Sequence, residues 1–517
     1  MNNLKYADQE RETALQNYMS AGEILEGLRN AGKNSPSQPV SMVTFHPDGI
    51  HWDEGVAYAL AVIEGEKFFS GISKAPVVFR SRNNTKPDDL QRRKTMNLGN
   101  CKGSVFDEHV DSKFQSRDPH TCTATRMAAY TNIDQRPELA NLLWYTFMTD
   151  SIRGQADWSM PRIVKNVNDY FESDQISAVK WVQIAVESHI YAMSHPELAP
   201  EFSLKLDDAV AYFLATKGLE LSKNKPKNLE ALILQALTDK VENLAEYLQN
   251  QQTGIDWSAT AEATNGSRAK LIARGLEIHE HPTVKQFFTY LEGANDNQLD
   301  EIEKLFELEK IIQDVSMQYG LEGALGWGRN AIAAQFYASQ IYTHVRQKFF
   351  DNVELCEVNG IKRTFTVGMI KVPKPAYGPS VLRFFHSQTA QKQAKKLKLR
   401  RPLVLAIIHP NGHSSVHFDQ SLIAEFGIDP DRVVRQLRFC DLKKKHLPIP
   451  IPNTTEILSQ PGEGPCKSWF YHSEGKNIIC SWDQEPTALK PEEILDAISD
   501  ALTKRTPTGP KKPAHTV

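Results

Sequence analysis

VTFHPDGIHWDEGVA, residues 43–57, passes from a short β-branched and aromatic run through a Pro-Asp-Gly turn into a helical pattern. A strand that leads into a helix is the repeating unit of open α/β sheets, which build their sites at the carboxyl ends of strands. Four side chains in this stretch can bind a metal or move a proton: His46, His51, Asp53 and Glu54. Imidazole nitrogens and carboxylate oxygens are ligands that Mn²⁺, Fe²⁺ and Zn²⁺ accept. We therefore expect half of a divalent-metal site for phosphoester hydrolysis here.

A structural interpretation of the same residues also stands. Asp53 sits where the helix is expected to begin, so it can serve as the N-cap. Glu54 is then a first-turn carboxylate that suits the positive end of the helix dipole.

The chain around this stretch predicts an α/β fold. Strand-like and helix-like segments alternate over residues 40–150, which favours a mostly parallel sheet. The expected strands there are 40–45 and 75–80, with short apolar runs at 95–98 and 104–106, and the expected helices are 53–64, 122–132 and 139–149. Helical periodicity dominates residues 158–350, and strand-like runs return over 355–500. The predicted domains are 1–39, an N-terminal helix and linker; 40–194, a metal-binding α/β domain; 195–350, a helical region; 351–504, a smaller C-terminal α/β domain; and 505–517, a disordered tail.

Composition limits the class of protein. The 517 residues carry a net charge of −3, so any polyanion has to be met by a local basic patch. The six cysteines are scattered and form no CxxC pair, which argues against a structural zinc site and favours a reducing compartment. The N-terminus has no apolar signal-peptide core and no stretch is long enough to cross a membrane. We expect a cytoplasmic protein without a membrane partner.

Two downstream groups offer further ligands. Asp107, Glu108 and His109 follow a short apolar run, and a carboxylate beside a histidine can fix the tautomer of the ring. Asp150 ends an apolar helix-like run. Each group has an ordinary alternative, because such triplets are frequent in loops and a lone aspartate is often a helix cap or a solvated residue.

The order and spacing of these groups resemble the Asp-His-His (DHH) phosphoesterase superfamily, and within it the family named for the melanocyte proliferating gene, the MYG exonucleases. That family opens with T-H-N-G-x-F-H-x-D-E, and TFHPDGIHWDE (44–54) keeps both histidines, the aspartate and the glutamate. The later matches are RSRN (80–83) for R-T-R-D, NLGN (97–100) for D-V-G-G, FDEHV (106–110) for Y-D-H-H-Q, MTDS (148–151) for A-I-D-N-G and MPRIVKNVNDYF (160–171) for R-x-x-x-L-N-P. Weaker matches follow at 402–413, 431–438 and 468–476.

The resemblance implies a DHH-phosphoesterase-like parallel-sheet domain with a one- or two-metal site, holding Mn²⁺ or alternatively Mg²⁺, that cuts phosphodiesters as a 3′–5′ exonuclease on RNA. The implied metal ligands are His46, His51, Asp53, Asn97, Asp107 and Asp150. The implied catalytic residues are Asp107, Glu108 and His109. The implied partner is single-stranded RNA or a short oligonucleotide; the oligomeric state is open, with a homodimer among the options.

Two departures from the family pattern keep alternatives open. Asn97 stands where the family has aspartate, and a neutral amide is a weaker ligand for a hard cation. Glu108 stands where the family has the first histidine of its pair. One metal is then lost, or the metal preference shifts towards oxygen ligands, or the chain is an inactive relative that serves as a binding protein. A small-molecule phosphoesterase is the enzymatic runner-up.

Substrate contacts require positive charge. The expected phosphate-binding residues near the motifs are Arg80 and Arg82, and those in the C-terminal domain are His413, Arg438 and His472. A basic run, AKKLKLRR (394–401), is a further candidate, because lysine and arginine hold phosphates without reading sequence. The alternative for each basic run is a solvated surface.

Overall fold

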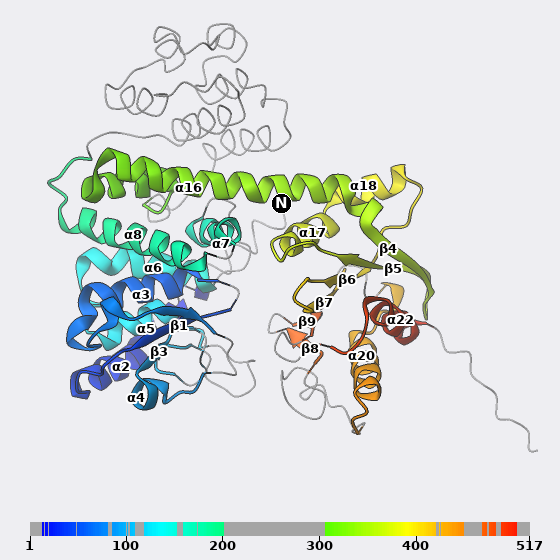
Figure 1. Cartoon of the computed structure of the whole chain (residues 1–517), viewed down its shortest axis with the longest axis horizontal. Coiled ribbons are helices and arrows are strands. Elements are labelled where there is room, and N and C mark those ends of the chain that lie inside the picture. The colour runs from blue at the N-terminus through cyan, green and yellow to red at the C-terminus, as the bar shows by residue number, and fades with distance from the viewer. Residues whose placement is uncertain are drawn as a thin grey trace, which may run out of the picture. The chain divides into compact units, whose positions relative to one another are not determined.

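The computed structural model divides the chain into two compact units, residues 1–112 with 116–340 and residues 113–115 with 341–517. The residues that it describes are 13–14, 16–18, 20–47, 49–80, 85–99, 101, 104–108, 118–151, 159–172, 174–200, 305–419, 423, 425–448, 468–472, 475–481 and 487–503. Figure 1 traces the elements of both units, and each unit is treated separately below.

The first unit is built on a parallel sheet of three strands in the order β2-β1-β3. These strands are β1 (Met42–Phe45), β2 (Val77–Phe79) and β3 (Thr95–Asn97). Thr44 lies opposite Val78 on one side and Asn97 on the other, so β1 is the central strand. The strands predicted at 40–45 and 75–80 are confirmed, and the short apolar run at 95–98 forms β3. The short apolar run at 104–106 forms turns.

Helices pack around this sheet, and residues 52–61 of α3 (Trp52–Glu64) are all buried. Its Gly55 leaves no room for a Cβ against Val182, so the glycine allows α3 and α8 to approach closely. The helices of this unit are α2 (Gly22–Asn34), α3, α4 (Asp89–Arg93), α5 (Thr123–Tyr130), α6 (Pro137–Ser151), α7 (Met160–Phe171) and α8 (Gln175–Ser194), with short 3₁₀ turns η1 (Gly65–Lys67) and η2 (Ile72–Lys74).

The N-terminal helix runs further than the sequence indicates. Gly32 was expected to open the linker, but α2 continues through it to Asn34. A Cβ at position 32 would collide with the backbone carbonyl of Tyr130, so this glycine serves close packing against α5. The expectation failed because a glycine near a helix end also has a packing use that local sequence does not reveal.

Of the helical region predicted for 195–350, the structure describes residues 195–200 and 305–350. The long helix α16 (Leu308–Asn352) has a break at Gly320, whose φ of 71° lies outside the helical region. Trp327 of α16 and Trp181 of α8 stack with ring centroids 4.2 Å apart, and each indole N–H donates to the other's backbone carbonyl. This reciprocal pair holds the part of α16 that belongs to the first unit against α8.

The second unit has a mixed six-stranded sheet in the order β4-β5-β6-β7-β9-β8. Within the described strands of this six-stranded sheet, only the β5–β6 pair is parallel. The strands are β4 (Val353–Asn359), β5 (Thr364–Lys371), β6 (Val404–Ile408), β7 (Ser414–Phe418), β8 (Phe470–His472) and β9 (Gly475–Cys480), and the helices are α17 (Tyr377–Phe385), α18 (Gln388–Lys396), α20 (Pro430–Lys444) and α22 (Pro491–Leu502).

Each unit has its own hydrophobic core, as expected for separate domains. The prediction of an α/β fold with a parallel-sheet domain and a smaller C-terminal α/β domain is confirmed. Among the described residues, no helix is both long enough and apolar enough to cross a bilayer.

Candidate metal centre

The loop between β1 and α3 carries the first ligand-type side chains and is held in place from a distant helix. Gly49 has a φ of 109°, a conformation that favours glycine, and the Asn168 side chain of α7 packs against it. The Asn168 amide donates to the Ile50 carbonyl at 2.7 Å and accepts from the Ile50 N–H at 3.3 Å. The Gln175 amide donates to the Pro47 carbonyl at 3.2 Å. Two helices therefore fix the turn that presents His46 and His51.

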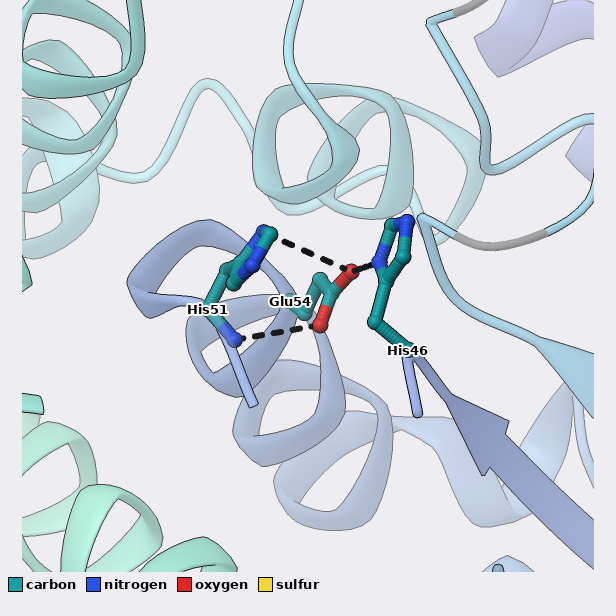
Figure 2. Close-up of side chains that lie close together, drawn as sticks. All are labelled: His46, His51 and Glu54. Atoms are coloured by element: carbon teal, nitrogen blue, oxygen red, sulfur yellow. Dashed lines mark hydrogen bonds and ion pairs between the residues drawn. The ribbon is translucent and has the colours of Figure 1, made fainter. Parts of the chain in front are cut away.

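The histidine cluster consists of His46, His51 and Glu54, whose ligand atoms lie within 4.8 Å of one another. His46 Nδ1 is 2.5 Å from Glu54 Oε1, and His51 Nδ1 is 3.9 Å from the same oxygen. Figure 2 shows the two imidazoles on either side of the Glu54 carboxylate. The rings stack with centroids 5.0 Å apart. His51 is the exposed member of the cluster and Glu54 the buried one.

Glu54 organises this cluster through both of its oxygens. While Oε1 engages His46, Oε2 accepts from the backbone N–H of His51 at 3.1 Å, which caps the start of α3. Gly99, with a φ of 65°, makes room for it, because a Cβ there would collide with the Glu54 carboxylate. When His46 Nδ1–H donates to a carboxylate, Nε2 carries the lone pair that can bind a metal. Glu54 therefore holds the His46 ring in place, and with a proton on Nδ1 the ring leaves Nε2 available to a metal.

The acidic cluster consists of Asp53, Glu108 and Asp150, each of which offers an oxygen within 4.8 Å of the other two. Asp53 and Glu108 are buried, and Asp150 is partly buried at the end of α6. The Thr123 hydroxyl at the start of α5 donates to Glu108 Oε2 at 2.9 Å. Four segments that are distant in the sequence thus converge on one largely buried position.

Asp53 and Glu54 are neighbours on α3 but belong to different clusters. Successive residues of an α-helix point about 100° apart, so adjacent side chains leave the helix in different directions. The Trp52 indole donates to the Thr146 hydroxyl at 3.1 Å, which ties the start of α3 to the last turn of α6 before Asp150. The expectation that Asp53 is the N-cap is wrong, because the structure places His51 at that position.

The acidic cluster gathers like groups, because three carboxylates lie close together in a largely buried position and repel one another when all are ionised. Their field reaches Cys122, where burial raises the pKa of the thiol to about 12 and the Asp53 and Glu108 carboxylates add to the increase. A bound divalent cation removes the repulsion, so the donor set fits a hard ion such as Mn²⁺ or Mg²⁺. The histidine cluster, with nitrogen donors, suits Mn²⁺ or a softer metal.

Asn97 and Asp107 lie outside both clusters. The Asn97 carbonyl oxygen accepts from the Thr44 hydroxyl at 2.6 Å, and its NH₂ donates to the Lys86 carbonyl and to Asp89 at 3.3 and 3.2 Å. Asp107 is buried on the side of Cys101, where burial raises the thiol pKa to about 11 and Asp107 raises it further. The metal-binding roles inferred for these two residues stay predictions, and the Asn97 amide is already engaged in hydrogen bonds.

The remaining predicted residues are placed as follows. Arg80 directly follows β2, where its backbone N–H donates to the Phe45 carbonyl at 2.9 Å. His413 and Arg438 lie in the second unit; Arg438 is buried and its Nε donates to the Trp469 carbonyl at 2.6 Å. His472 ends β8, and nothing is described of its side chain. Arg82 and His109 lie outside the described residues.

Two glutamates have a larger part in the clusters than the sequence indicates. The metal ligands that the resemblance implies do not include Glu54, and the resemblance gives Glu108 a catalytic role, whereas the structure places each of them in a cluster of ligand-type groups. Asn168 was not singled out, and only its position in the segment 160–171 pointed to it. Its pairing with Ile50 joins residues 118 positions apart, which no local pattern reveals.

Comparison with known proteins gives one distant likeness. No family model matches the chain, and no curated protein is significantly similar in sequence. A solved structure described as a DHH domain protein, a member of the S1p family of ribosomal proteins, aligns with 96% of this chain and 92% of its own. The TM-score is 0.33 and the identity 10%, so this likeness decides neither the fold nor the activity.

Proposed function

We propose that this chain is a metal-dependent phosphodiesterase, a 3′–5′ exonuclease that acts on single-stranded RNA or short oligonucleotides with Mn²⁺, or alternatively Mg²⁺. The observation that carries the proposal is the pair of clusters around the start of α3, one with two histidines and one with three carboxylates. Each member of the two clusters offers a nitrogen or oxygen atom of the kind that binds a divalent cation, and the atoms of each cluster lie within 4.8 Å of one another.

The position of the clusters supports a catalytic role over a structural one. His46 directly follows β1, the central strand of the parallel sheet, and open α/β sheets bind their ligands at the carboxyl ends of strands. The motif order in the sequence supports the phosphoesterase class, and the 3′–5′ polarity rests on the resemblance to the MYG exonucleases alone. RNA as substrate rests on the same resemblance.

The residues have separable tasks in this proposal. Asp53, Glu108 and Asp150 would hold one cation, and His46 and His51 would contribute nitrogen ligands to a second site. Divalent ions at such sites stabilise the attacking and leaving oxygens of an in-line phosphoryl displacement. Glu54 holds the tautomer and direction of His46, and Asn168 holds the loop. Arg80, at the end of the neighbouring strand, is the proposed phosphate-orienting cation.

A catalytically inactive binding protein is the second candidate, and one observation favours it. Position 97 holds an asparagine, so it offers no carboxylate to join the two clusters. Its amide is already hydrogen-bonded to Thr44, Lys86 and Asp89. An enzyme that uses the acidic cluster alone, with one metal, lies between the two candidates.

Metal content and hydrolysis test the proposal together. We expect the purified chain, dialysed against Mn²⁺, to retain one to two equivalents of metal and to shorten 5′-labelled RNA progressively from its 3′ end. Asp53→Ala should abolish this shortening, whereas Asp88→Ala, at an exposed ion pair with Arg92 on the surface of the same unit, should not. A folded wild-type chain that retains no metal and leaves RNA, dinucleotides and bis-p-nitrophenyl phosphate intact would instead establish the binding protein.

A further inference from the structure

The second unit contains a long stretch of one charge sign. Residues 372–418 contain no aspartate or glutamate, although the whole chain has a net charge of −3. The same stretch contains eight lysines and arginines: Lys374, Arg383, Lys392, Lys395, Lys396, Lys398, Arg400 and Arg401. Segregated charge of this kind creates a local positive field that a nearly neutral protein otherwise lacks.

Helix α18 turns the lysines of this stretch outward. The helix buries Ala390 and Ala394, one turn apart, against the unit. Lys392, Lys395 and Lys396 occupy the opposite face, because positions three and four apart share one side of a helix. All three are exposed, as is Lys398 in the turn that follows. Four lysines therefore line one continuous exposed strip.

The arginines that follow these lysines differ from them, because each arginine pairs with a carboxylate. Arg400 pairs with Glu357 at 2.7 Å, and buried Arg401 pairs with Asp419 and lies over the Phe385 ring. Across the part of the chain that the structure describes, the four lysines form no ion pair with a carboxylate. A solvated helix usually intersperses glutamate with lysine at this spacing, and α18 contains none.

We propose that this lysine strip, Lys392, Lys395, Lys396 and Lys398, binds the phosphate backbone of single-stranded RNA without reading its sequence. Lysine acts as a point charge on phosphate oxygens, so a group of exposed lysines without carboxylate partners suits a polyanion. The exposed side chains of Leu397 and Leu399, on either side of Lys398 in the sequence, offer apolar contact to bases and sugars. The inference rests on the proposed function for the choice of RNA as the polyanion.

Salt-dependent binding tests the strip in the full-length chain. Fluorescence anisotropy with a labelled single-stranded oligoribonucleotide, in EDTA so that no strand is cut, gives the dependence of log Kd on log salt. Each neutralised phosphate of a single strand contributes about 0.7 to that slope. The variant Lys392→Gln/Lys395→Gln/Lys396→Gln/Lys398→Gln should therefore reduce the slope by about 3 and weaken binding at least about tenfold near 0.1 M salt.

The matched control removes the same charge from residues that already pair with carboxylates. In this control, Lys348, Arg363, Lys371 and Lys444 are changed to glutamine. These four residues pair in turn with Asp351, Glu425, Glu492 and Glu493. We expect this control to lower the slope by less than about 1. If the strip variant loses its fold by circular dichroism, the single charge reversal Lys392→Glu serves in its place, with at least about threefold weaker binding expected.

Three outcomes decide the matter. Equal slopes for the strip variant and the control overturn the proposal and leave the strip a solvated surface. Binding to phosphatidylserine vesicles that needs the lysines together with Leu397 and Leu399, with RNA binding unchanged, overturns it in favour of a membrane surface. Lysine-dependent RNA binding by a wild-type chain that hydrolyses nothing supports the strip and contradicts the proposed function. The strip variant should still cleave bis-p-nitrophenyl phosphate if the wild type does.

Discussion

The histidine cluster and the acidic cluster take neighbouring residues, Glu54 and Asp53, from the first turn of α3, yet they differ in donor chemistry. In the histidine cluster, Glu54 is bonded to His46 and to the backbone of His51, so its charge is compensated within the protein. The acidic cluster brings together the three carboxylates of Asp53, Glu108 and Asp150. We therefore expect a bound cation to stabilise the acidic cluster more than the histidine cluster.

The largest effect is expected from the acidic cluster. Glu108→Gln keeps the shape of the side chain and an oxygen that can accept from Thr123, but removes one negative charge. Mn²⁺-dependent hydrolysis should fall about 1000-fold, which is about 4 kcal/mol of transition-state stabilisation. In EDTA the same variant should be more stable by about 1 kcal/mol, because the repulsion is relieved. Steady-state kinetics and urea unfolding measure the two effects, and a loss of stability in EDTA would contradict the comparison.

The opposite change in stability in EDTA is expected for a substitution in the histidine cluster. Glu54→Gln cannot orient His46 as a carboxylate does, so metal affinity or activity should fall about 10- to 100-fold. Its stability in EDTA should also fall, by about 1 to 2 kcal/mol, because a buried charge-assisted hydrogen bond is lost. Isothermal titration with Mn²⁺ and urea unfolding provide the measurements. Glu26→Gln, at an exposed position of α2 that pairs with Arg29, is the control and should change neither.

A change in α7 should separate the two clusters without touching either. Asn168→Ala removes both hydrogen bonds to Ile50, at a cost of about 2 kcal/mol in stability. Because the freed loop carries His46 and His51, Mn²⁺ affinity should fall about tenfold at the histidine cluster and little at the acidic cluster. Mn²⁺ titrations of Asn168→Ala in a Glu108→Gln background isolate the first cluster. Equal loss at both clusters would show a general structural role for Asn168.

The smallest effect on the clusters themselves is expected from a half-buried carboxylate outside both of them, which serves as a reference. Burial raises the pKa of Asp169 to about 6 from 3.8, and Lys165 partly offsets the increase. The folded state then binds more protons than the unfolded state between about pH 4 and pH 6, so stability falls as pH rises through this window. Asp169→Asn should be more stable than the wild type by about 1 to 2 kcal/mol at pH 7. The difference should vanish below about pH 4, and one that persists there would exclude titration of Asp169 as the cause.

Local sequence was sufficient for the elements and for much of the site. The β-branched and aromatic residues before His46 predicted β1, and the helical pattern after His51 predicted α3, each within a residue or two of its observed bounds. The three parallel strands followed from alternation of strand and helix patterns. Residue types alone indicated which groups can bind a metal, because donor chemistry belongs to the side chain.

Tertiary structure decided which of those groups meet. Asp53 and Glu54 are adjacent in sequence and point to different clusters, because the helix directs them apart and α5 and α6 bring Glu108 and Asp150 to one of them. Asn97 sits at the end of a neighbouring strand, as a ligand would, yet Thr44, Lys86 and Asp89 take up its amide. The sequence by itself determined the supply of ligands and the local elements, since both depend on the side chain and its near neighbours. Side-chain direction and partners over more than 100 residues depend on packing, and only the folded chain sets them.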